Sequence, residues 1–325
     1  HGHNLVTSAR RHGDDERAWC DQSGASAGVS GIGTPCTSVG ESPVYDEDNA
    51  DLYWVDVRDT PAIHRISLAT GVERSWPMRE DVGSIALTRQ GGLVVALRSG
   101  FAFFDPATAM LKPIVDPEPE RPMNRLNDGK CDAAGRFWCG SMNPDAGTAD
   151  GSVYVLGSDL HCNRVLADFV TPNGMAWSPD AGTLYIADTR RGYIYAHDFD
   201  PQSATLGARR TFADTGSLPG GPDGATIDRD GYLWSALWGG GALVRFDPRG
   251  RIERVVRLPV SKPTSCTFGG VGYRQLFVTT ATRGITAAQL SAEPLAGRVL
   301  QLDVGVAGLA PARFDSRADE RERAA

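Results

Sequence analysis

The sequence is short of paired cysteines, long apolar runs and helical periodicity. Its six cysteines include no Cys-x-x-Cys pair, which excludes zinc-finger and thioredoxin-like motifs. No stretch approaches the roughly 20 apolar residues of a membrane-spanning helix, and the N-terminus has no apolar core of a secretory signal. We therefore expect no membrane association and a cytoplasmic protein with reduced thiols. A disulfide between Cys20 and Cys36 is the alternative for an exported protein.

Positive charge is also scarce. Lys and Arg number 33 against 40 Asp and Glu, which gives a net charge of -7. Nucleic-acid binders gain affinity from basic side chains at phosphates, so no nucleic-acid partner is expected. There is no Gly-x-Ser-x-Gly elbow and no Walker-type phosphate loop, which disfavours acyl-enzyme hydrolases and P-loop NTPases. A hydrophobic content of 41% and a charged content of 22% are typical of a globular protein with a sizeable core.

The strongest positive feature of the sequence is a repeat. A short segment rich in β-branched and aromatic residues recurs six times, beginning at Leu52, Leu93, Phe137, Leu184, Leu233 and Leu276. The intervals run from 41 residues, between Leu52 and Leu93, to 49 residues, between Leu184 and Leu233. A unit of about 45 residues accommodates four short strands, which is the size of one propeller blade. The repeat predicts an all-β fold, a six-bladed β-propeller.

The repeat also sets the predicted domain boundaries. We expect the propeller at residues 38–314, a polar N-terminal tail at 1–37 that is partly tag-derived or disordered, and a polar C-terminal tail at 315–325. One helical pattern, Thr286 to Ala292, ends before Pro294 in the last unit. Four tryptophans of the strand segments are expected in the core between blades: Trp54, Trp138, Trp177 and Trp234. Trp238 is expected either there or at the channel mouth.

Polar side chains occupy equivalent positions in most units of this repeat. The innermost strand of each blade lines the central channel of a propeller, so equivalent positions converge there. Five units carry an oxygen-bearing side chain 10 or 11 residues before the repeated segment: Glu41, Asn127, Asn173, Asp223 and Ser265. Carboxylate and amide oxygens suit hard divalent cations, which predicts a metal-binding central channel. The alternative is that the Asn-Gly and Asp-Gly pairs form ordinary hairpin turns.

Five ordered motifs then resemble a known family. They are GESPVYDE at 40–47, RLNDGKCDAAGRFWCGSM at 125–142, PNGMAWSPD at 172–180, PDGATIDRDGYLWSALWGGGALVRFDP at 222–248 and PTSCTFGG at 263–270. Over roughly residues 39–303 the chain resembles the family of senescence marker protein 30 (regucalcin), gluconolactonase and luciferin-regenerating enzyme. The resemblance implies a six-bladed propeller, in agreement with the repeat.

The same resemblance implies site residues and a reaction. It assigns Glu41, Asn173 and Asp223 as ligands of one divalent cation, with Asp223 also the general base. Calcium is the first choice of cation, with zinc, manganese, magnesium and iron(II) as alternatives. Arg125, Asn127 and Asp145 are the implied substrate contacts. The expected reaction is hydrolysis of a sugar-acid lactone by metal-activated water.

Several alternatives stay open from the sequence. The same metal channel could serve a phosphotriesterase-like or other lactone hydrolase, or a calcium-binding protein without turnover. A further alternative is a binding propeller that needs no metal. The segment GASAGVSGIGTPCTS, before Gly40, is poor in strand formers, so the last blade is expected to close with residues 309–314 or to lack a closing strand. The identity of the lactone and the oligomeric state are not fixed by the sequence.

Overall fold

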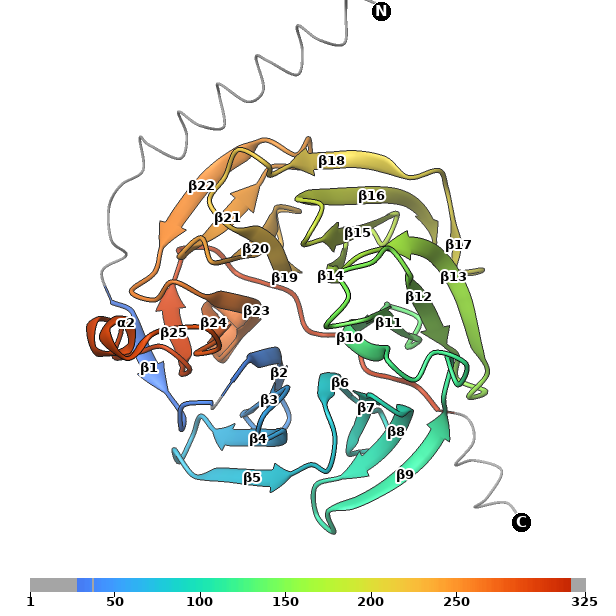
Figure 1. Ribbon diagram of the computed structural model, residues 1–325, viewed down its shortest axis with the longest axis horizontal. Coiled ribbons are helices and arrows are strands. Elements are labelled where there is room, and N and C mark those ends of the chain that lie inside the picture. The colour runs from blue at the N-terminus through green and yellow to red at the C-terminus, as the bar shows by residue number, and fades with distance from the viewer. Residues whose placement is uncertain (1–27, 37, 317–325) are drawn as a thin grey trace, which may run out of the picture.

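A computed structural model describes residues 28–36 and 38–316, which form six antiparallel sheets arranged around a central axis (Figure 1). Five of the sheets are built from strands that follow one another in the chain, with the first strand nearest the axis, and the sixth combines the last three strands with the first strand of the described residues. The predicted all-β, six-bladed propeller is therefore confirmed.

The first three blades each contain four strands. The first consists of β2 (Gly40–Asp46), β3 (Asp51–Asp56), β4 (Ala62–Ser67) and β5 (Glu73–Pro77). The second consists of β6 (Val82–Leu87), β7 (Leu93–Leu97), β8 (Gly100–Asp105) and β9 (Met110–Val115). The third consists of β10 (Arg125–Cys131), β11 (Phe137–Met142), β12 (Gly151–Leu156) and β13 (Cys162–Phe169).

The fourth blade has an additional short strand, and the fifth returns to four. The fourth consists of β14 (Pro172–Trp177), β15 (Thr183–Asp188), β16 (Tyr193–Asp200), β17 (Thr205–Leu206) and β18 (Arg210–Asp214). The fifth consists of β19 (Gly221–Ile227), β20 (Leu233–Trp238), β21 (Ala242–Phe246) and β22 (Ile252–Arg257).

The sixth blade joins the two ends of the fold. It consists of β23 (Pro263–Gly269), β24 (Gln275–Thr280), β25 (Val299–Asp303) and β1 (Ser30–Ile32). β1 pairs antiparallel with β25, with Gly31 opposite Leu300. Residues 30–32 therefore belong to the propeller, and the closing strand is neither absent nor formed by residues 309–314. A three-residue edge strand contributes mainly backbone hydrogen bonds, so it needs no strand-forming side-chain pattern.

The C-terminal segment, residues 304–316, follows β25 across one end of the ring (red in Figure 1). Gly308 forms a bridge to Asp228, and the amide of Phe314 donates to the Leu87 carbonyl at 2.8 Å. The Asp315 amide likewise donates to Gly135 at 2.9 Å. Ser316 is buried as well, so the packed part of the chain extends at least two residues beyond the predicted boundary at 314. Residues 1–27, which include Cys20, and residues 317–325 lie outside the described part of the chain.

Helical structure is confined to short connections. α2 (Ala287–Ala292) lies between β24 and β25 and begins after Thr286, whose side chain forms a capping box with Gln289. This matches the predicted helix. A single 3₁₀ turn, η1 (Val271–Tyr273), precedes β24. Neither of the helices among the described residues has the length and apolar character required to cross a bilayer.

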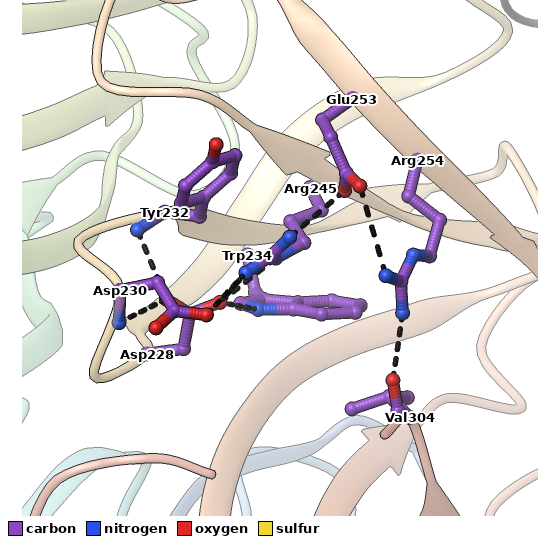
Figure 2. Close-up of polar contacts among 8 residues, drawn as sticks. All are labelled: Asp228, Asp230, Tyr232, Trp234, Arg245, Glu253, Arg254 and Val304. Atoms are coloured by element: carbon purple, nitrogen blue, oxygen red, sulfur yellow. Dashed lines mark hydrogen bonds and ion pairs between the residues drawn. The ribbon is translucent and has the colours of Figure 1, made fainter. Parts of the chain in front are cut away.

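The hydrophobic core lies between neighbouring blades. The four strand tryptophans predicted for the core, Trp54, Trp138, Trp177 and Trp234, are all less than one tenth exposed. They pack within clusters that join strands of adjacent blades. Figure 2 shows the polar network that holds Trp234 beside the start of the C-terminal segment. There the Asp228 carboxylate accepts from Trp234 Nε1 at 2.9 Å and from Arg245 Nε at 2.8 Å.

The same carboxylate also holds the turn that follows β19. Its Oδ1 accepts the backbone amides of Asp230 and Tyr232, each at 3.0 Å. Arg245, only 4% exposed, also donates to Glu253 at 3.0 Å. Because breaking a buried pair leaves a charge without its partner, such networks are sensitive to loss of one member.

Replacing Asp228 with Ala should lower the free energy of unfolding by about 3 kcal/mol, since the buried Arg245 loses a carboxylate partner. Asp247→Ala is the matched control. Asp247 accepts from the Arg249 and Arg251 amides and from Arg251 Nε, but Arg251 is 66% exposed and can be solvated. Urea unfolding measures both changes, and equal losses in the two variants would contradict the assignment.

Candidate active site

The predicted site residues of four blades meet in one cavity at the end of the channel opposite the C-terminal segment. This cavity, of about 620 Å³, is lined by Glu41 of β2, Arg125 and Asn127 of β10, Asn173 of β14 and Asp223 of β19. Each of these residues lies near the start of an inner strand. Since all inner strands begin at the same end of a propeller, the repeat brings them to the same end of the channel.

A β-bulge in each inner strand accompanies this convergence. The register with the second strand shifts just after the strand begins, for example between Glu41 and Val44 and between Asn173 and Ala176. Equivalent shifts occur in β6, β10, β19 and β23. A bulge leaves a residue unpaired and redirects its side chain. The Asn-Gly and Asp-Gly pairs therefore lie inside strands, and the hairpin-turn alternative is wrong for these positions.

Two glycines in the bulges allow the inner strands to approach closely. A Cβ atom on Gly174, which has a φ of +60°, would lie 2.6 Å from the carbonyl oxygen of Asp223. A Cβ on Gly224 would lie 2.1 Å from the Ser265 hydroxyl oxygen. Any larger residue would push the strands apart, so these glycines bring Asn173 and Asp223 to the same region of the channel.

A chain of hydrogen bonds fixes the two amides. Arg125 Nη1 donates to Asn127 Oδ1 at 2.8 Å, and Asn127 Nδ2 donates to Asn173 Oδ1 at 2.9 Å. Asn173 Nδ2 then donates to the Thr189 hydroxyl at 2.7 Å, which donates to the Pro222 carbonyl at 2.7 Å. Since Arg125 can only donate, the chain determines which end of each amide carries oxygen.

The two predicted carboxylate ligands are buried and repel each other. Glu41 is 8% exposed and Asp223 is 5% exposed. Burial, reinforced by the charge of Asp128, raises the pKa of Glu41 to about 8. Burial and the nearby Glu41 and Asp128 raise the pKa of Asp223 well above its usual range. Removal from water and like charges both disfavour ionised carboxylates, so this environment favours a cation beside them.

Asp128, adjacent to Asn127, is a channel carboxylate that the repeat analysis missed. It accepts the Gly129 amide at 3.0 Å and the Gly174 amide at 2.8 Å, so it holds the backbone beside Asn173. Burial raises its pKa, although the neighbouring Lys130 opposes that shift. A charged residue in a strand of buried residues is unusual, which is the signal that could have identified it.

The donor set fits a hard divalent cation. Within the described part of the chain no group of three His, Cys, Asp or Glu side chains is placed to hold a metal ion. A cation in this cavity would therefore need the Asn173 amide oxygen beside the carboxylates of Glu41 and Asp223. Two carboxylates and one amide provide the oxygen ligands that calcium and magnesium prefer, and ionised carboxylates would lose their mutual repulsion on binding.

Arginines and one carboxylate surround the mouth of this cavity. Asp81 lies 3.2 Å from Arg58, 3.1 Å from Arg98 and 3.7 Å from Arg125. Burial lowers the pKa of Arg125 to about 10, and its buried Nε has no hydrogen-bond partner in the structure. Asp145, the third predicted substrate contact, is 64% exposed and lies 3.8 Å from Arg58. It lies outside the cavity lining, whereas Trp238 is part of it.

Ser265, the fifth of the polar residues at equivalent repeat positions, does not line the larger cavity. It lines a separate cavity of about 190 Å³ together with Asp128, Lys130 and Leu309 of the C-terminal segment. In β23 the register shifts between Pro263 and Ser265, so Thr264 rather than Ser265 occupies the bulge. The C-terminal segment crosses this end of the channel, so the larger cavity is reached from the opposite face.

Comparison with known proteins identifies the family of this chain. Residues 39–282 match the model of the SMP-30/Gluconolactonase/LRE-like region family, and the chain belongs to that family. Regucalcin from Gallus gallus is 33% identical over 89% of this chain and 99% of its own.

Two solved structures are similar as well. One is a calcium-binding protein, regucalcin, from Agrobacterium tumefaciens, at 28% identity with a TM-score of 0.82 over 86% of this chain and 95% of its own. The other is a gluconolactonase from Xanthomonas campestris, at 25% identity with a TM-score of 0.68 over 83% and 87%. The predicted family is thus confirmed, with relatives named for calcium binding and for lactonase activity.

In metal-free protein, Glu41 should make stability fall as pH rises. Its pKa shifts from an ordinary 4.5 to about 8 on folding, so between these values the folded state binds more protons and the free energy of unfolding decreases. Glu41→Gln cannot titrate and should lose less stability between pH 5 and pH 8. Urea midpoints measured with a chelator at both pH values test this, and parallel declines would contradict it.

Proposed function

We propose that the protein is a metal-dependent hydrolase that opens the lactone ring of a sugar acid, converting an aldonolactone to the aldonic acid. The observation that carries the proposal is the meeting of Glu41, Asn173 and Asp223 with Arg125 and Asn127 in one cavity. Membership of a family that includes gluconolactonases supports it.

Glu41, Asn173 and Asp223 would hold one divalent cation, with calcium the first candidate because all donors are oxygens. When bound, such a cation supplies Lewis acidity and stabilises negative charge developing on oxygen. The relative described as a calcium-binding protein supports this choice. The alternative metals are zinc, manganese, magnesium and iron(II).

Asp223 would act as the general base that removes a proton from the attacking water. A base must lie within reach of the reacting atoms and have a pKa near the working pH. Burial and like charges raise the pKa of Asp223, which strengthens it as a base, while its ionised form requires a neighbouring cation. Asp223 is only 5% exposed, which limits exchange of the transferred proton with bulk water.

Arg125 and Asn127 would orient the lactone by hydrogen bonds to its oxygens. The Arg125 side chain is 9% exposed, and its Nε has no hydrogen-bond partner in the structure, although it lies 3.7 Å from the Asp81 carboxylate. Donors held in place before the substrate arrives reduce the entropic cost of reaching attack geometry. Asp145 remains a predicted substrate contact through the rim beside Arg58.

We also infer a cytoplasmic role in carbohydrate metabolism. The thiols of Cys139 and Cys266 are buried, and burial raises the pKa of Cys266 to about 12. Thiols kept protonated in this way are unreactive, as suits a protein of a reducing compartment.

Asp223→Asn should reduce kcat by at least about 100-fold because the general base is lost. Asp180→Asn is the matched control: it also follows a proline, but Asp180 caps an exposed turn by accepting from Ser178 and Gly182. A pH-indicator assay across several aldonolactones, on protein stripped with chelator and reloaded with each metal, measures both. Wild-type kcat in metal-loaded Asp223→Asn would contradict the assigned role.

Tight calcium binding without hydrolysis of any lactone would instead favour a calcium-binding protein. Isothermal titration with each cation, on the same stripped sample, separates that outcome from a catalyst that lacks its metal. The comparison requires no variant and is therefore independent of folding defects.

A further inference from the structure

Positive side chains gather around the mouth of the active-site cavity. The cavity lining contains two acidic residues, Glu41 and Asp223, and five arginines: Arg58, Arg125, Arg190, Arg191 and Arg283. The whole chain carries a net charge of -7, so this concentration of arginine is opposite in sign to the rest of the protein. Clefts lined by one sign of charge attract ligands of the opposite sign.

Three of these arginines have acidic partners. Arg58 and Arg125 lie 3.2 Å and 3.7 Å from Asp81, and Arg191 lies 2.8 Å from Asp168. Each of these three guanidinium groups therefore has a carboxylate partner within the protein, although Arg58 and Arg125 share Asp81 with Arg98. They are less available to an incoming anion than arginines without such a partner.

Arg190 and Arg283 differ from the other three. Within residues 28–36 and 38–316, neither side chain has a hydrogen bond or an ion pair, and both residues are exposed. Arg190 follows β15 in the fourth blade and Arg283 follows β24 in the sixth. Both therefore lie in loops that leave the second strand of a blade at the mouth.

Neighbouring groups hold these two residues in place. The Arg190 guanidinium lies against Gly147, where a Cβ atom would be 2.6 Å from Nη1. The Arg283 amide donates to Ser38 at 3.1 Å, and its carbonyl accepts from Lys262 Nζ at 2.5 Å. That ammonium also lies 5.1 Å from the ring of Trp238, which adds a third cation to the rim.

We propose that the substrate carries an anionic group, a carboxylate or a phosphate, remote from its lactone carbonyl, and that Arg190 and Arg283 bind this group. The inference rests on the proposed lactonase function, because it places the lactone at Glu41, Asn173 and Asp223. A cavity of about 620 Å³ accommodates a sugar acid together with such a group. Guanidinium groups bind carboxylates and phosphates through paired hydrogen bonds.

The test compares three lactones of one carbon skeleton: gluconolactone, which is neutral, glucarolactone, which adds a carboxylate, and 6-phosphogluconolactone, which adds a phosphate. The measured quantity is the ratio of kcat/KM for each anionic lactone to that of the neutral lactone. We expect a wild-type ratio of about 10 or more for one anionic lactone, since each tenfold corresponds to one charge-assisted hydrogen bond. The anionic lactone with the higher ratio shows whether the group bound by the arginines is a carboxylate or a phosphate.

The double variant Arg190→Gln/Arg283→Gln should lower that ratio about tenfold, mainly through KM. Arg79→Gln/Arg249→Gln is the matched control, because it removes the same charge from exposed arginines outside the cavity lining and should leave the ratio unchanged. A fall of equal size in the control would show that only the overall charge matters, and would overturn the proposed contact.

Binding of glucarate and of 6-phosphogluconate, measured by calorimetry on calcium-loaded protein, gives a readout independent of turnover. Binding of either anion that weakens in Arg190→Gln/Arg283→Gln supports the anion site even if no lactone is hydrolysed, in which case only the lactonase function fails. Hydrolysis of gluconolactone with a wild-type ratio near 1 and no effect of the double variant would overturn this inference alone.

Discussion

The site depends on how closely the six inner strands approach one another at the propeller axis. Gly174 and Gly224 occupy points where a single additional carbon would collide with the next blade. The bulge beside each glycine admits this approach and redirects a polar side chain into the channel. The close packing of the inner strands therefore also keeps the site residues together. If the strands moved apart, Glu41, Asn173 and Asp223 would no longer lie in one cavity. This explains why residues far apart in the chain can form a single site on a rigid frame.

The charges of the channel form layers along its axis. Lys130 and Asp128 line the smaller cavity, the carboxylates of Glu41 and Asp223 line the larger one, and arginines surround its mouth. Burial makes each acidic group hold its proton more tightly than in water. A molecule entering from the mouth meets positive charge first and the oxygen donors last. This order suits a polar, oxygen-rich substrate whose reactive group is at its inner end.

The spacing of polar residues within the repeat predicted most of the site. In a propeller, residues at equivalent positions of successive repeats lie close together around the axis. The prediction failed where the symmetry of the repeats is broken. Ser265 has the right spacing, but the bulge of β23 lies one residue earlier, so its side chain reaches the other cavity. Asp128 was missed because the spacing selects one residue in each blade. Arg190 and Arg283 lie in loops whose lengths differ between blades, and β1 is too short to carry a side-chain pattern.

The sixth blade combines the first described strand of the chain with its last three strands. During synthesis on the ribosome, β25 cannot emerge until almost the whole chain has been made, so β1 must wait for its partner. Five blades can stack in order of translation, whereas the ring closes only with a contact between residues about 270 positions apart. Such non-local pairing is slow to form. The closing step thus makes completion of the ring, and of the channel it surrounds, conditional on synthesis of the chain as far as β25.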